Sequence, residues 1–393
     1  GLNDVKEKRE KMFALGITED KDPCRNLTIE QVEEYLKDNK PFAIKLKSKG
    51  NGQGKIKVND VLKGEIEIQE NGEDAVLLKS DFMPTYAFAH AIDDHLMGTT
   101  VVVRGEEWIP SYPLHIEIHE ALGFPLPKYI HTPLINKIRE NGGKTKISKR
   151  IDAEADMRFF AKEGYGPKAL IEYLTNLANS NFEIWRKNNP NADVDEFPFD
   201  GFNITANRPV FDIVKLNDIS KDIVSRYSAE TCYQKLLAWA KEFSGENVAY
   251  LEKDKDYVLK VLNIDREKEK PRKDIFKWSM VLDYYDYMFS APKSYQIEET
   301  DRKRFEEVLR SYKSHINLTD KDAWFGSIKD MAKELGYATD NKEYKLNKEK
   351  FKGNVAKVCE FLRVAVTGHK DSPDLFEIMS ILGKEKVLER ISL

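Results

Sequence analysis

The segment Thr99-Thr-Val-Val-Val-Arg104 is an apolar, β-branched run that predicts a buried strand ending at Arg104. A helical pattern follows from Leu114 to Leu122, and Lys128 to Pro133 predicts a second strand. This strand–helix–strand order is typical of a parallel βαβ unit, in which ligands bind at the carboxyl ends of the strands. We therefore expect Arg104 to lie beside a binding site.

A basic loop follows this unit, with the sequence Lys144-Thr-Lys-Ile-Ser-Lys-Arg150. Its cations are close enough together to hold a polyphosphate once the loop closes. They are Lys144, Lys146, Lys149 and Arg150. Gly142 and Gly143 precede them and leave the backbone free to move. Taken alone, the run is more typical of a solvated basic loop.

The first quarter of the chain alternates short elements in the manner of a mixed α/β domain. Residues 3–15 are helical in pattern, and a Thr cap followed by Glu predicts a second helix over Asn26–Tyr35. Glycine and asparagine turns separate the short strands expected at Phe42–Leu46, Ile56–Val58, Glu65–Ile68 and Ala75–Leu78. A short helix is expected at Thr85–Ala91, and helical patterns dominate from residue 151 onward. Nothing before residue 80 indicates catalysis.

The composition is that of an ordered protein with room for several domains. The chain has 393 residues, of which 41% are hydrophobic and 33% are charged. Because 63 basic side chains balance 67 acidic ones, any nucleic-acid surface must be a local patch. Cys24, Cys232 and Cys359 are too scattered for a disulfide framework or a complete zinc site. We expect a cytoplasmic protein, with no apolar run long enough to span a membrane.

Several motifs occur in a fixed order along almost the whole chain. They are Ser80-Asp-Phe-Met-Pro-Thr-Tyr86, Asp93-Asp94-His95, Arg104-Gly-Glu-Glu-Trp108, Lys146-Ile-Ser-Lys-Arg150, Phe211-Asp-Ile-Val-Lys-Leu-Asn217, Arg363-Val-Ala-Val-Thr-Gly368 and Ile381-Leu-Gly383. Any one of these motifs is weak evidence. Together, their order and their gaps resemble a class I glutamyl-tRNA synthetase.

This resemblance implies an α/β plus all-α protein. Its parts would be an acceptor-end (connective) α/β insertion at 1–79, the C-terminal half of a Rossmann-type catalytic domain at 80–158, a stem-contact region at 159–235 and a helical anticodon-binding region at 236–393. Such synthetases open with a strand and a His-Ile-Gly-His-type motif, which this sequence lacks. We therefore expect the chain to begin inside the insertion and to be unable to form the adenylate by itself.

The resemblance also implies ATP-dependent ligation of glutamate to its tRNA by a monomer, with ATP bound as its Mg²⁺ complex. Lys146, Ser148 and Lys149 would be the catalytic phosphate loop. Glutamate would be bound by Tyr86, His90 and Arg104, although family members often carry a smaller polar residue than His90. The ATP side would be formed by Glu107, Trp108, Lys146, Lys149 and Arg150.

Simpler interpretations of these residues stay open. Arg104 could pair with Asp93 or Asp94, and Tyr86 could be a core residue. His90 and Asp94 are four residues apart, as are His115 and His119, but no third ligand is evident, so we expect no metal. Cys24 resembles one ligand of a zinc site found in some relatives. Its partners would lie upstream of residue 1, so no zinc is expected from this chain alone.

The C-terminal half would read tRNA, because RNA loops are recognised by stacking on aromatic side chains and by arginine. Candidates are the basic run 268–273, Trp278, Tyr284 and Tyr285, while Trp239, Phe276 and Trp324 are expected in the core. The alternative function is a non-catalytic tRNA-binding protein or regulator derived from such a synthetase. A tRNA-modifying relative would lack the helical C-terminal region, and Arg104-Gly-Glu-Glu-Trp108 argues against a glutaminyl enzyme.

Overall fold

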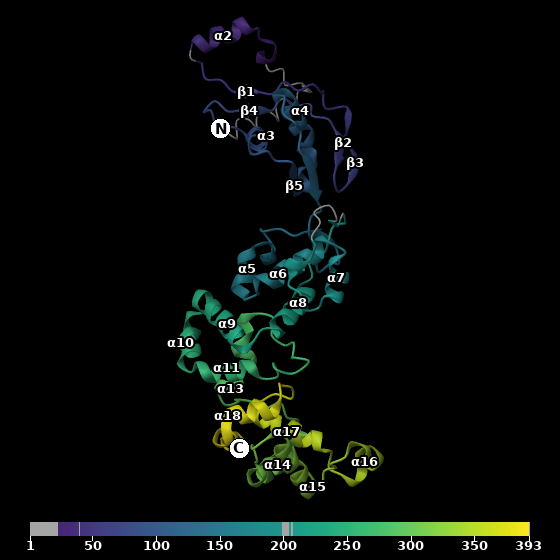
Figure 1. Ribbon diagram of the computed structural model, residues 1–393, viewed down its shortest axis with the longest axis vertical. Coiled ribbons are helices and arrows are strands. Elements are labelled where there is room, and N and C mark those ends of the chain that lie inside the picture. Colours follow the sequence, from purple (N-terminus) through teal and green to yellow (C-terminus); the bar gives the residue numbers. More distant parts are fainter. Residues whose placement is uncertain (1–22, 39, 199–203, 206, 393) are drawn as a thin grey trace. The chain divides into compact units, whose positions relative to one another are not determined.

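The computed structural model describes residues 23–38, 40–198, 204–205 and 207–392. The chain divides into two compact units, Gly1–Ile135 with Phe199–Pro209 and Asn136–Pro198 with Val210–Leu393 (Figure 1). The helix expected over residues 3–15 lies outside the described residues. Across the described part, no helix is both long enough and apolar enough to cross a membrane.

The first unit is an α/β assembly, as the sequence predicts. Its helices and strands are α2 (Ile29–Lys37), β1 (Ile44–Lys45), β2 (Lys55–Asp60), β3 (Gly64–Gln69), β4 (Val76–Leu78), α3 (Tyr86–Met97), β5 (Val101–Gly105), α4 (Tyr112–Leu122) and β6 (Lys128–Thr132), with 3₁₀ turns at Pro23–Asn26 and Glu106–Ser111. The expected Thr cap is confirmed, since Thr28 and Gln31 form a reciprocal capping box at the start of α2. The first strand is shorter than expected.

Strands β5 and β6 pair in parallel, which confirms the predicted βαβ unit. Helix α4 is the connection between them and ends at Gly123, whose φ of +69° favours glycine. The register sets Arg104 opposite His131, so these residues reach the same edge of the sheet at its carboxyl end. The other strands form antiparallel pairs, β1 with β4 and β2 with β3.

The first unit has two hydrophobic clusters, and each combines residues from both sides of position 80. One joins Val58 of β2 to Val102 of β5, with Tyr112 and Tyr129. The other consists of Leu46, Leu77, Ala91 and Ile118. Burial of these side chains fastens the strands that precede residue 80 to the βαβ unit that follows it.

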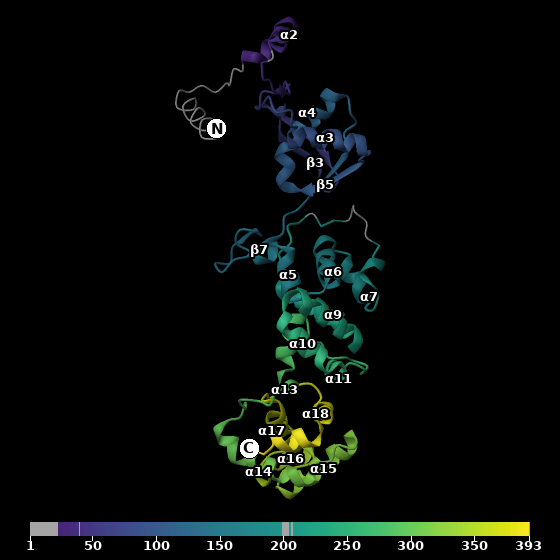
Figure 2. The same ribbon diagram turned by 90° about the vertical axis from the view of Figure 1, so that its left-hand side faces the viewer.

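The second unit is mainly helical. Its helices are α5 (Met157–Glu163), α6 (Pro167–Ala178), α7 (Phe182–Asn188), α8 (Ile213–Ser225), α9 (Ala229–Phe243), α10 (Gly245–Lys253), α11 (Lys255–Asn263), α12 (Val281–Tyr284), α13 (Asp286–Phe289), α14 (Arg302–His315), α15 (Lys321–Glu334), α16 (Asn341–Leu346), α17 (Val355–Thr367) and α18 (Leu375–Arg390). A hairpin of β7 (Asn136–Ile138) and β8 (Lys144–Lys146) projects from its helices (Figure 2). This hairpin was not predicted from the sequence.

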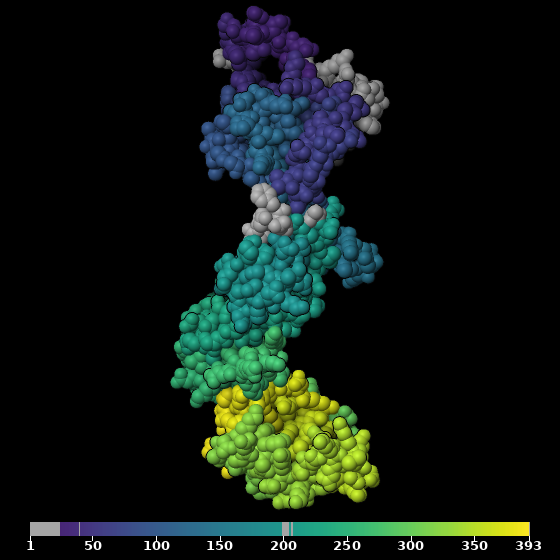
Figure 3. Space-filling view, turned by 45° about the vertical axis from the view of Figure 1, so that its right-hand side comes forward, coloured from purple at the N-terminus to yellow at the C-terminus, as the bar shows by residue number. Residues whose placement is uncertain are grey.

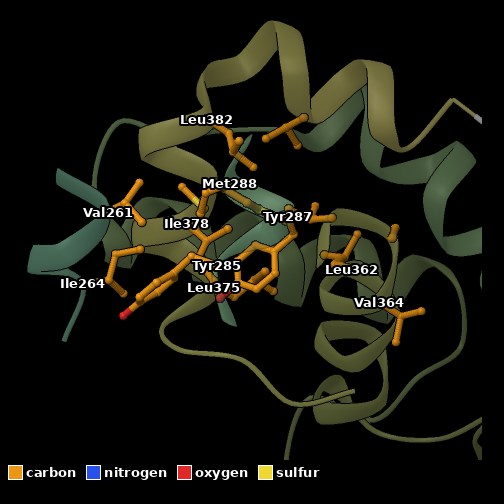
Figure 4. Close-up of a cluster of buried hydrophobic side chains, with 14 of the residues drawn as sticks. Val261, Ile264, Tyr285, Tyr287, Met288, Leu362, Val364, Leu375, Ile378 and Leu382 are labelled. Carbon is orange, nitrogen blue, oxygen red and sulfur yellow. The ribbon is translucent and has the colours of Figure 1, made fainter. Parts of the chain in front are cut away.

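One large hydrophobic core extends through the second unit from α8 to the end of α18. Figure 4 shows its middle, where Tyr285 and Met288 meet Ile378 and Leu382. Figure 3 shows the last helices, in yellow, continuous with the green segment that includes α14 and α15. The expected class, an α/β region followed by an all-α region, is therefore confirmed.

Candidate functional site

Arg104 lies where the strand pattern predicts, at the carboxyl end of β5. Its Nε donates a hydrogen bond to Nε2 of His131 at 2.9 Å, and Nη2 reaches the carbonyl of Trp108 at 3.4 Å. The guanidinium lies over the ring of Tyr129, 4.8 Å from the centroid. Nη1 is buried without a hydrogen-bond partner. The alternative pairing with Asp93 or Asp94 is therefore wrong, and Nη1 of this half-buried cation is left for a ligand.

Tyr86 is the exposed part of this site, and the core interpretation of it is wrong. Its side chain is 57% exposed, although it begins helix α3. Its ring stacks on His90 at 5.7 Å between centroids and lies 5.1 Å from that of Trp108. The guanidinium of Arg104 is 5.9 Å from the centroid of Trp108. The fold therefore brings Tyr86, His90, Arg104 and Trp108 together.

Buried polar atoms without hydrogen-bond partners gather around the same place. Such atoms belong to His90 (Nε2), Asp94 (Oδ2), Arg104 (Nη1), His115 (Nδ1 and Nε2), His119 (Nε2) and Tyr129 (the hydroxyl). Elsewhere in the described residues, only one side-chain atom each of Arg186, Tyr287 and Tyr337 is buried without a hydrogen-bond partner. A buried donor or acceptor without a partner costs about 1–3 kcal/mol, so this concentration indicates a site completed by a polar ligand or water.

Burial disfavours the charged forms of His115 and His90. It lowers the pKa of His115 to about 3, and the positive charge of Arg104 acts in the same direction. Burial also lowers the pKa of His90, against the attraction of Asp94. His90 Nε2 lies 3.1 Å from Asp94 Oδ2 without hydrogen-bond geometry. Arg104 is therefore the dominant positive charge, and the arrangement suits a carboxylate ligand.

The histidine spacings noted in the sequence do not assemble a metal centre within the described residues. His115 and His119 are linked instead through the His115 carbonyl, which lies 2.8 Å from His119 Nδ1. The group with metal-ligand spacing is Asp265, Asp374 and Glu377, in the second unit. The ammonium of Lys268 already contacts all three carboxylates. The place among these carboxylates is therefore taken by an amine.

The segment after Arg104 supplies one residue that the sequence analysis missed. Glu106 accepts hydrogen bonds from Lys63, at 2.9 Å, and from Arg208. These two bases lower the pKa of the Glu106 carboxyl despite its partial burial. Glu107, expected at the ATP side, is exposed, and its carboxylate folds over Gly105. Glu106 therefore fixes the local backbone, and no sequence signal separated it from its neighbour.

The basic loop of the second unit is held more firmly than the two glycines suggested. Gly142, with a φ of +78°, forms the turn of the β7–β8 hairpin. Arg139 donates its backbone N–H to the Gly143 carbonyl at 2.8 Å and accepts from Gly142 N–H at 2.8 Å. The expectation that these glycines free the loop is therefore corrected, because they close a tight turn.

Asp152 closes the other end of the loop. Its carboxylate accepts from both Nη atoms of Arg139 and from Ser148 N–H at 2.8 Å. These hydrogen bonds, with that of Arg139 the largest cause, hold the pKa of Asp152 far below its usual range. Lys149 and Arg150 lie between the fixed points and are exposed, as is Lys146 on β8. The loop thus presents cations from a fixed base, as phosphate binding requires.

The aromatic candidates for stacking on RNA are corrected by their burial. Trp278 and Tyr285 are buried in the helical core, and Tyr284 donates its hydroxyl to Asp274 at 2.7 Å. Within the basic run 268–273, Lys268 contacts the carboxylates of Asp265, Asp374 and Glu377, and Arg272 pairs with Asp274. Trp324 is a core residue, as expected. These groups are engaged in holding helices together.

An open pocket of about 380 Å³ lies between α15, α17 and α18. It combines an aromatic wall with basic side chains, and its lining includes Lys321, Trp324, Phe325, Arg363, Asp374 and Leu375. Arg363 donates to the carbonyls of Ser372 and Pro373, at 2.9 and 2.8 Å, and so shapes the turn before α18. The sequence analysis identified Arg363 only as part of a motif.

Two family models match the chain. The model for the catalytic domain of class I tRNA synthetases (E and Q) matches residues 2–188, and an anticodon binding domain model matches residues 231–393. The glutamate–tRNA ligase of Acetivibrio thermocellus is 42% identical over 371 residues, which cover 93% of this chain and 68% of that protein. That of Clostridium perfringens strain 13 is 40% identical over 380 residues, with the same coverage.

A solved structure gives the same relationship. The crystal structure of a glutamate tRNA ligase from Elizabethkingia meningosepticum, in complex with its amino acid, superposes with a TM-score of 0.72 at 25% identity. The match covers 99% of this chain and 76% of that one. A second structure, from Elizabethkingia anophelis, matches at 26% identity with a TM-score of 0.72.

Proposed function

This chain belongs to the glutamate–tRNA ligase family, and we propose on that basis that it binds glutamate, ATP and tRNA for glutamate during aminoacylation. In this reaction the glutamate α-carboxylate attacks the α-phosphate of ATP and releases pyrophosphate. A ribose hydroxyl at the tRNA 3′ end then takes the glutamyl group and releases AMP. Little covalent chemistry falls to the protein, so its residues act by positioning and by stabilising charge.

The observation that carries this proposal is the state of Arg104. A half-buried guanidinium whose buried Nη1 has no partner is complementary to a carboxylate, which can accept two hydrogen bonds from one arginine. We assign Arg104 to a carboxylate of glutamate, with Tyr86 and His90 beside it. Trp108 and Glu107 would border the ATP and the tRNA terminus. The neutral histidines leave the charge of Arg104 available to the substrate.

The fixed basic loop would serve ATP. Lys149 and Arg150 would contact the phosphates of ATP bound with Mg²⁺, and Lys146 would join them from β8. Ser148 would keep the loop in shape, because its N–H is already held by Asp152. These roles fit the family's phosphate loop, and they also follow from the exposure of the three cations.

The pocket beside Phe325 would take a base of the tRNA. Its place in the region that matches the anticodon binding domain supports this assignment, as does its aromatic wall. Stacking of a base on an aromatic side chain is worth about 1–3 kcal/mol. Lys329, whose ammonium lies 4.8 Å from the ring centroid of Phe325, would contribute nonspecific attraction to phosphates.

The test is a titration of the purified chain with tRNA for glutamate and with an unrelated tRNA, at one moderate salt concentration. We expect tighter binding of the glutamate tRNA, because the nonspecific electrostatic contribution is the same for both. A parallel titration with glutamate compares the wild type with Arg104→Lys, and Arg208→Lys serves as a matched control. Equal binding of both tRNAs, or glutamate binding that Arg104→Lys leaves unchanged, would contradict the proposal.

A further inference from the structure

Arg104 is backed by a buried pair of residues, His131 on β6 and Asp60 at the end of β2. His131 is wholly buried, and Asp60 is 3% exposed. Asp60 Oδ2 accepts from the backbone N–H of His131 at 3.0 Å and lies 2.7 Å from His131 Nδ1. His131 Nε2 lies 2.9 Å from Arg104 Nε. The three side chains form one continuous chain of hydrogen bonds.

The direction of each hydrogen bond follows from chemistry. An arginine Nε always carries a hydrogen and can only donate, so His131 Nε2 must be the acceptor. The imidazole must then be neutral, with its proton on Nδ1, and that N–H donates to Asp60. Burial lowers the pKa of His131, in agreement with a neutral ring. One tautomer is thus selected by its two neighbours.

Asp60 is itself immobilised from its other side. Its Oδ1 accepts from the backbone N–H groups of Leu62 and Lys63, at 3.0 and 2.9 Å. These bonds fasten the carboxylate to the turn between β2 and β3. The hydrogen-bond chain therefore begins at the turn between β2 and β3 and ends at the Nε atom of Arg104.

We propose that Asp60 and His131 are positioning residues for substrate recognition, which hold Arg104 by Nε so that its unpartnered Nη1 faces the ligand. The inference rests on the proposed role of Arg104 in binding glutamate. An arginine held only by its flexible stem would lose side-chain entropy when it binds a carboxylate. The hydrogen bond to His131 already restricts the Arg104 side chain before glutamate binds, so less side-chain entropy is lost on binding. Asp60 fixes the tautomer of His131 without contacting the guanidinium of Arg104, so the charge of Arg104 is not neutralised.

The first test reads the tautomer directly. In the full chain labelled with ¹⁵N-histidine, we expect His131 to give the signals of the Nδ1–H tautomer at pH 7, assigned by their loss in His131→Gln. Asp60→Asn leaves a single oxygen to serve both His131 and the Leu62–Lys63 turn, which weakens the acceptor for Nδ1–H and should shift His131 towards the Nε2–H form. An Nε2–H tautomer in the wild type, or one that Asp60→Asn leaves unchanged, would overturn the inference.

The second test measures the dissociation constant for glutamate by calorimetric titration, and in the variants that keep Arg104 also from shifts of the Arg104 Nε–H signal. Asp60→Asn and His131→Ala should each weaken binding about tenfold, the equivalent of about one lost hydrogen bond. His131→Gln should stay within about threefold of the wild type, because its amide oxygen can accept from Nε. The exposed His95 supplies the control His95→Gln, which should change nothing. If Asp60→Asn does not fold, the ratio of the glutamate dissociation constants of His131→Ala and His131→Gln decides the test.

The outcomes separate this inference from the proposed function. Loss of glutamate binding in Arg104→Ala, with normal binding in Asp60→Asn and His131→Ala, would overturn the positioning role alone. Normal binding in Arg104→Ala would overturn the assignment of the glutamate site, while the tautomer measurement would still report on the hydrogen-bond chain. A wild-type chain in which glutamate leaves the Arg104 signal unmoved would overturn both.

Discussion

Arg139 and Asp152 face each other across the basic loop in a two-pronged ion pair, with Nη1 2.5 Å from Oδ1 and Nη2 2.9 Å from Oδ2. The same guanidinium donates from Nε to Thr145 Oγ1 at 2.6 Å and from Nη2 to the Lys146 carbonyl at 3.2 Å. One arginine therefore joins both sides of the segment that presents Lys149.

Asp152→Asn should loosen this loop. The change removes the negative charge opposite Arg139 and weakens the acceptor for Ser148 N–H, so the chain between them opens more often. We expect tryptic cleavage after Lys149 and Arg150 to accelerate roughly tenfold, because proteolysis follows local opening. Glu154→Gln, which alters a neighbouring pair with Lys137, is the matched control. An unchanged rate in Asp152→Asn would show that the pair does not restrain the loop.

Lys149→Ala should weaken ATP binding. Loss of one cation from a phosphate contact is expected to raise the dissociation constant about tenfold, the equivalent of about 1.4 kcal/mol. Lys144→Ala removes an exposed lysine from the same hairpin and should have a smaller effect. The comparison is made by ATP titration in Mg²⁺ buffer. Equal effects of the two substitutions would indicate a general attraction between charges without a specific contact at Lys149.

The stability of the first unit should fall as the pH is lowered from about 6.5 towards 3. The pKa of His115 is about 3 in the folded chain, whereas an unperturbed histidine has a pKa of about 6.5. Between pH 6.5 and about pH 3 the unfolded chain therefore binds a proton at His115 that the folded chain does not bind. The free energy of unfolding therefore decreases by about 1.4 kcal/mol per pH unit for this group, and the contribution is fully present above pH 6.5.

This pH dependence can be measured by urea titrations followed on the backbone amides of α4 at pH 7.5, 6.5 and 5.5. His115→Gln should flatten the dependence, and His95→Gln should leave it as in the wild type, since His95 is exposed. A slope that survives His115→Gln undiminished would assign the proton to another group of the cluster.

Phe325→Ala should weaken the binding of tRNA for glutamate. Loss of a stacking surface from the pocket costs about 1–3 kcal/mol per base. Phe243→Ala, in α9, changes a partly exposed phenylalanine outside this pocket and serves as the control. Both variants are titrated at several salt concentrations. A stacking contact predicts an unchanged salt slope, whereas a change of slope would point to phosphate contacts instead.

The local elements of the fold could be predicted because their signals are contained in short segments. The βαβ unit is predicted by the run of valines before Arg104 and by the helical spacing after it. The capping residue Thr28 indicates the start of α2. The β7–β8 hairpin was missed because its strands are only three residues long and rich in lysine. Charged residues of this kind carry no hydrophobic alternation from which a strand can be recognised.

The candidate site could be predicted only in part, for a related reason. Tyr86, His90, Arg104 and Trp108 were identified by motif, and they do converge. Asp60 and His131 were not, since they are 71 residues apart and the link between them exists only after β2 and β6 are folded. Conversely, Trp278 and Tyr285 have the composition of an RNA-binding surface, but the packing of the helices hides them. Residue type alone does not report burial.

The position of Asp60 bears on how this protein could be rebuilt or recombined. The family resemblance assigns this carboxylate to a connective insertion and would place His131 and Arg104 in the nucleotide-binding half. Replacing residues 1–79 as an independent module would leave the buried His131 without the acceptor for its Nδ1–H. Transplants between relatives are therefore expected to tolerate variation in α2 and in the β2–β3 surface, but to require an acidic residue at position 60.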